Sequence, residues 1–266
     1  MELDWAELER LVKPSPNYPD IPRRLLDVFA YDFVRKHYNH SMIEAQAYAV
    51  QLLGSDPRRR YGAMLEEVTG IFQRLHDLGA RSTHEFILSV ENRQKLEEFY
   101  RRSQLPLQSL VGVLHYLLYW VLPARIYLRE LVEPEDPQQL AYVATLRESG
   151  VRFNLDMLEM GRTRQFRDRL ARITGVPEEF IFDLTNRADF TRLPYVRGST
   201  VRNYFNAGYT SLEKLAQADL GRLQADMDCY AAAIGKNLKH GMELDSGIVI
   251  AGILPKIVNP RTARVK

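Results

Sequence analysis

The sequence predicts an all-α protein, because helix start signals recur along the chain and strand signals are sparse. Three capping boxes pair a Ser or Thr cap with a Glu three residues later: Ser41–Glu44, Ser82–Glu85 and Thr210–Glu213. Asp56-Pro57 and Asp136-Pro137 each place a capping carboxylate before a proline at the first helical position. The best strand candidate is 247–258 (GIVIAGILPKIV), a β-branched run that fits a short strand or an extended docking arm.

The apolar pattern predicts long helices in most of the chain and shorter helices near its end. Long helices are expected at 3–12, 22–38, 42–53, 57–78, 84–102, 107–132 and 137–172. Shorter helices are expected at 177–186, 199–207, 211–218 and 221–236. Residues 13–22 hold four prolines and indicate an extended strap, and residues 133–137 (EPEDP) indicate a connector.

This change in helix length predicts the domain organisation. Residues 1–165 are expected to form a bundle of long helices, residues 166–240 a small helical module, and residues 241–266 an extended basic tail that docks back or engages a partner. The net charge of the chain is +2, but residues 161–266 hold 17 Lys+Arg and 11 Asp+Glu, a net of +6. A basic C-terminal third favours an anionic partner for that part, with uneven scatter of surface charge as the alternative.

The most apolar segment is residues 107–122 (LQSLVGVLHYLLYWVL). Its length of about 16 residues falls short of the roughly 20 that a membrane-spanning helix needs. A buried central helix is therefore expected, with no membrane association. His115 fits a core histidine bonded to a tyrosine or a carbonyl, and the alternative is a pocket for an apolar ligand near His115, Tyr119 and Trp120.

Motifs of catalysis and metal binding are missing from the sequence. No G-x-S-x-G, P-loop or dinucleotide-binding motif occurs, and His37 and His40 have no further ligand at a matching offset. The expectation is a protein that is not an enzyme and holds no metal or cofactor. Cys229 is the only cysteine, and the acidic start MELDWAELERL is unlike a secretory signal, which together suggest a reducing cytoplasm.

Arginines concentrate in MGRTRQFRDRLAR. On a helix, Arg162, Arg169 and Arg172 cluster loosely on one face and Arg164 and Arg167 on another, while Phe166, Leu170 and Ile173 form the expected apolar stripe. This helix could present a phosphate-facing surface or a solvated amphipathic face.

Residues 188–219 have the layout of a helix, a tight turn, a second helix, a glycine-containing hinge and a third helix. The run ADFTRLPYVRGSTVRNYF followed by NAGYTSLEKLAQAD resembles a helix-hairpin-helix-like domain of an uncharacterised bacterial family. It is also similar to the helix-hairpin-helix module of archaeal repair helicases. The resemblance covers roughly 166–240 and implies a compact helical fold used for nucleic-acid or protein binding.

The turn departs from the family pattern, which is apolar-Pro-Gly-Val-Gly. Leu193, Pro194 and Val196 match, but Tyr195 and Arg197 occupy the two glycine positions. These substitutions weaken the expectation of phosphate binding, since glycines allow the backbone to approach a phosphate closely.

Other polar residues around the second helix could form a different anion site. The candidate nucleic-acid- or anion-binding residues are Arg197, Gly198, Ser199, Thr200, Arg202, Lys236 and Lys239. The sequence thus leads to three hypotheses: an adaptor acting through this module, a non-sequence-specific nucleic-acid binder, and a helical sensor with an apolar ligand. The partner, protein or nucleic acid, stays open, and the bundle is a possible homodimer.

Overall fold

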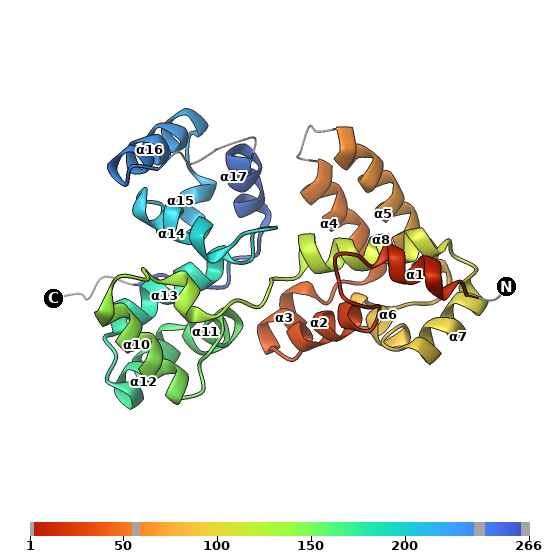
Figure 1. The fold of residues 1–266 in the computed structure, drawn as a ribbon, viewed down its shortest axis with the longest axis horizontal. Coiled ribbons are helices and arrows are strands. Elements are labelled where there is room, and N and C mark those ends of the chain that lie inside the picture. The colour runs from red at the N-terminus through yellow and green to blue at the C-terminus, as the bar shows by residue number, and fades with distance from the viewer. Residues whose placement is uncertain (1–2, 55–58, 237–242, 262–266) are drawn as a thin grey trace. The chain divides into compact units, whose positions relative to one another are not determined.

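A computed structural model describes residues 3–54, 59–236 and 243–261 of the protein (Figure 1). The chain divides into two compact units, residues 1–123 and residues 124–266, which are described separately below. Regular secondary structure in the described ranges is helical and includes no strand, so the all-α prediction is confirmed. Two isolated bridges, Ser41 to Ser82 and Tyr127 to Phe153, join extended residues at helix starts.

The first unit contains eight described α-helices and one π-helical segment. They are α1 (Trp5–Leu11), α2 (Asp20–Phe29), α3 (Asp32–Tyr38), α4 (Met42–Gly54), α5 (Arg59–Asp77), α6 (Thr83–Ser89), α7 (Arg93–Ser103), α8 (Leu107–Tyr116) and η1 (Leu117–Val121).

Helix α8 lies at the centre of this unit and contacts α1, α2 and α5. Six of its residues are buried, which confirms the prediction of a buried central helix. The helix ends earlier than predicted. After Tyr116 the chain forms the π-helical segment η1, in which Leu122 N–H donates to the carbonyl of Leu117. Pro123 follows and has no backbone N–H to continue the helix. Among the described residues, no helix has both the length and the apolar character needed to cross a membrane.

The predicted helix starts are confirmed where local side chains control them. Ser41 and Glu44 form a reciprocal capping box, with bonds of 3.3 Å from Glu44 N–H to Ser41 Oγ and 2.8 Å from Ser41 N–H to Glu44 Oε2. Ser82 also caps its helix, although Glu85 reaches the N–H of Arg81 instead of that of Ser82. The predicted start at Asp56-Pro57 lies outside the described residues.

The second unit contains the remaining helices. They are α9 (Leu128–Leu131), α10 (Pro137–Glu148), α11 (Asn154–Gly161), α12 (Arg164–Thr174), α13 (Glu178–Phe190), α14 (Gly198–Asn206), α15 (Leu212–Ala216), α16 (Leu220–Ala233) and α17 (Glu243–Ile253). Helix α13 is central here, with contacts to α9, α11, α12, α14 and α15.

The single helix predicted at 137–172 is wrong, since the chain forms α10, α11 and α12 over this range. Asp136 starts α10 by accepting from the N–H groups of Gln138 and Gln139, as predicted. Gly150 adopts φ +92°, which breaks the helix, and Thr163 caps α12 by accepting from Phe166 N–H. Helix α11 packs on α12 and α13, so the predicted domain boundary at 165 falls inside the second unit.

Two further predictions near the C-terminus are corrected. The strand candidate 247–258 is helical as far as Ile253, and α17 packs on α15 and α16 with Ile250 and Ala251 buried and Val249 exposed. The third hairpin helix is capped by Ser211, which accepts from Lys214 N–H, and not by Thr210 with Glu213.

The C-terminal tail is extended only after α17, in contrast to the prediction of an extended segment from residue 241. Asn259 N–H donates to the carbonyl of Arg162 at 2.8 Å. Arg261 lies 3.1 Å from a carboxylate oxygen of Glu178 and 2.9 Å from one of Glu179. The described part of the tail therefore docks back on the C-terminal end of α11 and the start of α13, as one of the two predicted alternatives states.

Candidate anion-binding groove

The turn between α13 and α14 is built on a buried ion pair. Arg192 donates to Asp189 at 2.7 Å, and both side chains are almost fully buried. Burial raises the pKa of Asp189, and the charge and hydrogen bond of Arg192 oppose that rise. This pair fixes the end of α13 from which the turn departs.

Tyr195 stands where the helix-hairpin-helix pattern has its first glycine, and its backbone has a conformation that glycine favours. Its φ is +58°, in the left-handed region, and its side chain is 63% exposed. Arg197, at the second glycine position, has φ −109°, which any residue adopts. The tyrosine therefore projects outward from a turn whose backbone still follows the glycine geometry.

Helix α14 begins immediately after this turn. Arg197 is its N-cap residue and makes no side-chain cap, while its carbonyl accepts from Val201 N–H at 3.1 Å. The N–H groups of the first turn have no partner within the helix, and the helix dipole adds positive potential there. This helix start favours an anion.

Gly198 lets this helix start approach α9. A Cβ added at Gly198 would lie 2.8 Å from the carbonyl carbon of Glu130 and closer still to its oxygen. The Arg202 guanidinium donates to the same carbonyl oxygen. Glycine is required here because any side chain would collide with the backbone of Glu130.

A second set of contacts holds the end of α9 against α13 and α14. Arg187 donates to the carbonyl of Leu131 at 2.9 Å and lies 3.8 Å from a carboxylate oxygen of Glu133. Arg202 lies 3.8 Å from Glu133 Oε2, and Asn206 donates to Glu133 Oε1 at 3.1 Å. Glu133 is thus the common acceptor of two helices, which gives Arg202 a positioning role.

A groove of about 480 Å³ opens where α9, the start of α10 and the start of α14 meet. Its lining consists of Arg129, Glu130, Pro134, Leu140, Arg197, Gly198, Ser199 and Arg202. Arg129 and Arg197 are exposed, and the guanidinium group of Arg197 makes no hydrogen bond or ion pair with any described residue. Two exposed guanidinium groups and a helix N-terminus give this groove the chemistry to accept a carboxylate or a phosphate.

Four of the seven predicted binding residues line this groove: Arg197, Gly198, Ser199 and Arg202. Thr200 is half-buried and lies beside the lining residues, Lys236 follows α16 and is not part of the lining, and Lys239 lies outside the described residues. The other wall of the groove, which includes Arg129 and Leu140, is not among the residues predicted from the sequence. Arg129 falls at the end of the predicted helix 107–132 and Leu140 at the start of the predicted helix 137–172, so no local signal marks this wall.

The arginine-rich helix α12 differs from the prediction. Arg167 is fully buried, donates from Nε to Glu178 at 3.2 Å and from a terminal nitrogen to the carbonyl of Gly161 at 3.0 Å. Its guanidinium carbon also lies 4.7 Å from the centre of the Phe182 ring. Arg167 is therefore a core residue and cannot face a phosphate.

The predicted apolar stripe of α12 is wrong for the same reason. Phe166 is 38% exposed and Ile173 is 65% exposed, while Leu170 is buried as expected. The internal acceptors for Arg167 rotate the helix so that the arginine faces the core and these two apolar residues face solvent. Arg169 and Arg172 are exposed.

His115 of the first unit has the surroundings of a core histidine. His115 is half-buried with its ring centre 5.7 Å from that of Tyr119, and burial lowers its pKa while a backbone hydrogen bond to Val12 opposes the shift. This contact fits the predicted core histidine. In the described ranges no group of three or more His, Cys, Asp or Glu side chains is arranged to hold a metal ion.

Comparison with protein families adds one match. Residues 139–239 match a domain of unknown function (DUF4332). This supports the expectation of an uncharacterised domain family. The matched segment begins at residue 139, after the end of α9, and includes Leu140 and the whole of α14. The groove is therefore lined both by this domain and by the helix α9 that precedes it. Neither the curated proteins nor the solved structures give a significant match to the chain.

Proposed function

We propose that this protein is a non-enzymatic binding protein, an adaptor that docks an acidic segment of a protein partner in the groove beside α14. The observation that carries the proposal is the pairing of two exposed guanidinium groups, Arg129 and Arg197, with the uncapped start of α14 around one cavity. A carboxylate entering there would meet charge-assisted hydrogen-bond donors on several sides.

The other lining residues favour a protein partner. Pro134 and Leu140 add apolar surface beside the arginines, and the exposed ring of Tyr195 lies on the turn that leads into α14. Arginine and aromatic side chains are enriched at protein interfaces, where they bury large areas. Glu130 also lines the groove and would repel a uniformly negative polymer more than a peptide of mixed composition.

The second candidate is a nucleic-acid binder, and the position of Arg197 favours it. This arginine stands in the turn that, in the helix-hairpin-helix resemblance, faces a phosphate, and no described residue neutralises it. Binding of this kind weakens steeply with salt, because phosphate contacts release counterions. Salt dependence therefore separates the two candidates.

The test is fluorescence anisotropy with labelled probes at low and physiological salt. The probes are a Glu- and Leu-containing peptide, single-stranded DNA and double-stranded DNA. The test variants are Arg197→Ala and Arg129→Ala, and Arg172→Ala is the matched control, because Arg172 is an exposed arginine of α12 that does not line the groove.

Peptide binding that falls about tenfold in each groove variant and is unchanged in the control supports the adaptor, since a lost charge-assisted bond costs roughly 1.5 kcal/mol. DNA binding with a steep salt slope and the same variant pattern replaces it with the second candidate. Equal binding by all variants removes the groove from either function.

A further inference from the structure

Helix α4 carries apolar residues on both of its faces. Met42, Ala45, Tyr48, Ala49, Leu52 and Leu53 are buried. On the opposite side, Ile43 is 57% exposed and Val50 is 52% exposed. A helix that is apolar on all sides is normally covered on all sides, whereas a surface helix shows polar residues outward. The outward face of α4 therefore has the composition of an interface.

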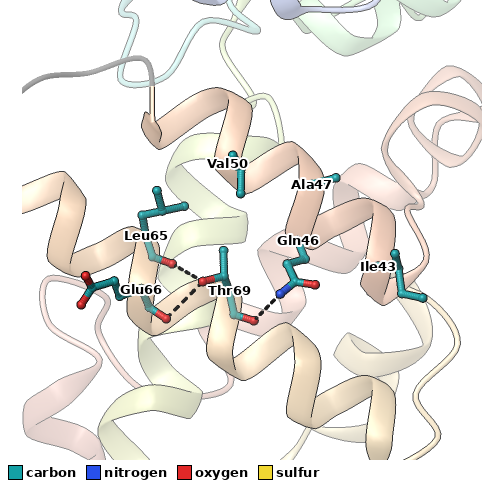
Figure 2. A pocket seen from close by; sticks show the side chains of 7 residues that line it. All are labelled: Ile43, Gln46, Ala47, Val50, Leu65, Glu66 and Thr69. Carbon is teal, nitrogen blue, oxygen red and sulfur yellow. Dashed lines mark hydrogen bonds between the residues drawn. The ribbon is translucent and has the colours of Figure 1, made fainter.

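This face borders a groove of about 500 Å³ between α4 and α5 (Figure 2). Ile43, Ala47 and Val50 line it from α4, and Leu65 and Thr69 are among the residues that line it from α5. The side-chain amide of Gln46 donates to the carbonyl of Thr69 at 3.4 Å and links the two walls. The groove is a feature of the packed helix pair.

The outward residues of α4 follow the spacing of a helix–helix seam. Ile43, Ala47, Val50 and Gly54 are separated by four, three and four residues, which places them within about 60° of one another around the helix. Large and small residues alternate along this seam. Ile43 and Val50 project from the seam, whereas the small residues Ala47 and Gly54 leave space beside them.

We propose that this seam pairs with the same seam of a second copy of the chain, antiparallel about a two-fold axis between residues 47 and 50. In this register Ile43 lies against the partner subunit's Gly54, and Ala47 lies against the partner subunit's Val50. A large residue meets a small one at every level, so the seam is complementary to itself. A two-fold dimer requires this self-complementarity, because each residue pair occurs twice.

The charge of α4 also favours a second copy over a charged partner. Glu44 is the only charged residue among the thirteen of this helix. In the antiparallel pair the two Glu44 side chains lie at opposite ends of the seam, away from the axis, and the helix dipoles oppose each other favourably. In the groove beside this face the lining adds one carboxylate, Glu66 of α5, and no cation, so a nucleic acid or an acidic peptide would find no positive charge to pair with there.

The size of the outward face of α4 limits how strongly two copies of the chain can associate. Thirteen residues at 1.5 Å per residue give a helix about 20 Å long. A pair of that length with its flanking groove buries less than the roughly 800 Å² per partner of a standard stable interface. We therefore expect a weak dimer whose population depends on protein concentration. It uses a surface of the first unit and does not rest on the proposed function of the second unit.

Sedimentation velocity of the full chain, from sub-micromolar to high micromolar concentration, tests the dimer. Ala47→Glu places two carboxylates beside the two-fold axis and should weaken dimerisation about tenfold or more. Ala63→Glu is the matched control, because Ala63 is an exposed alanine of α5 that does not line the groove. Circular dichroism checks that both variants keep the helical content of the wild type.

A mixture of two variants tests the register. Val50→Lys alone also disfavours the dimer, but in a mixed dimer its lysine faces the glutamate of the Ala47→Glu chain. An equimolar mixture should therefore dimerise more strongly than either variant alone. A wild-type chain that stays monomeric, a dimer unaffected by Ala47→Glu, or a mixture that does not recover would each overturn the proposal.

Discussion

The backbone of Glu130 leaves no room for a side chain on Gly198. An added Cβ would lie 2.8 Å from the carbonyl carbon of Glu130 and 2.9 Å from its Cβ. Gly198→Ala should therefore push the start of α14 away from α9 and lower the free energy of unfolding of the second unit by about 1–3 kcal/mol, the usual cost of overpacking. It should also weaken ligand binding in the groove.

The measurement is hydrogen exchange of α13 and α14 together with denaturation followed by circular dichroism. Fluorescence cannot serve, because both tryptophans, Trp5 and Trp120, belong to the first unit. Ser199→Ala is the control for the stability measurement, since Ser199 is exposed and α14 has no side-chain cap that it could remove. Equal stability of the two variants would show that α9 yields easily at this contact.

Tyr195 holds a positive φ that glycine adopts at no steric cost. Tyr195→Gly and Tyr195→Ala both remove the contacts of the ring, but only glycine relieves the left-handed backbone. We expect the glycine variant to be more stable than the alanine variant by about 1 kcal/mol, measured by the same denaturation. An alanine variant of equal or greater stability would contradict the left-handed turn.

Arg167 and Arg169 lie two residues apart on α12 and should respond very differently to truncation. Arg167→Ala removes the buried donor to Glu178 Oε1 and to the carbonyl of Gly161 and opens a cavity, so we expect a loss of about 3 kcal/mol or more. Arg169 is exposed, and Arg169→Ala should change stability by less than about 0.5 kcal/mol. Similar losses in both variants would place Arg167 at the surface, as the sequence pattern suggested.

The stability of the first unit should fall in mildly acidic solution. Burial lowers the pKa of His40 and that of His115 below the ordinary value of 6.5; the charge of Glu44 opposes the first shift, and the backbone hydrogen bond to Val12 opposes the second. The unfolded chain therefore takes up protons first as pH decreases. The stabilisation is complete above pH 6.5 and is lost as pH falls through the lower pKa of the folded state.

Urea denaturation followed by tryptophan fluorescence, at roughly pH 7.5 and pH 5.5, measures this dependence. His115→Gln should reduce the difference between the two conditions, while His76→Gln, a change at an exposed position, should leave it as in the wild type. A wild-type unit equally stable in both conditions would contradict the burial of these imidazoles.

Several parts of the candidate site could be predicted from the sequence, and others could not. Arg197, Gly198 and Ser199 were predicted because they surround a helix start that the local pattern marks. Arg129 and Leu140, on the opposite wall, were missed, because the approach of α9 to α14 depends on the absence of a Cβ at Gly198 and on the long-range contacts of Glu133. Both contacts join residues that are far apart in the chain, so the local sequence pattern does not predict them.

The sequence by itself determined the helical class and the helix starts at Ser41 and Asp136, because a capping side chain and its N–H partners lie within a few residues of each other. The tertiary structure decided which faces are buried. Arg167 faces the core and Ile173 faces solvent, because the acceptors of the guanidinium group lie inside the fold. The apolar run at 247–253 is helical because tertiary packing outweighs its local strand preference. Burial is a property of the whole fold, whereas a cap is a property of four residues.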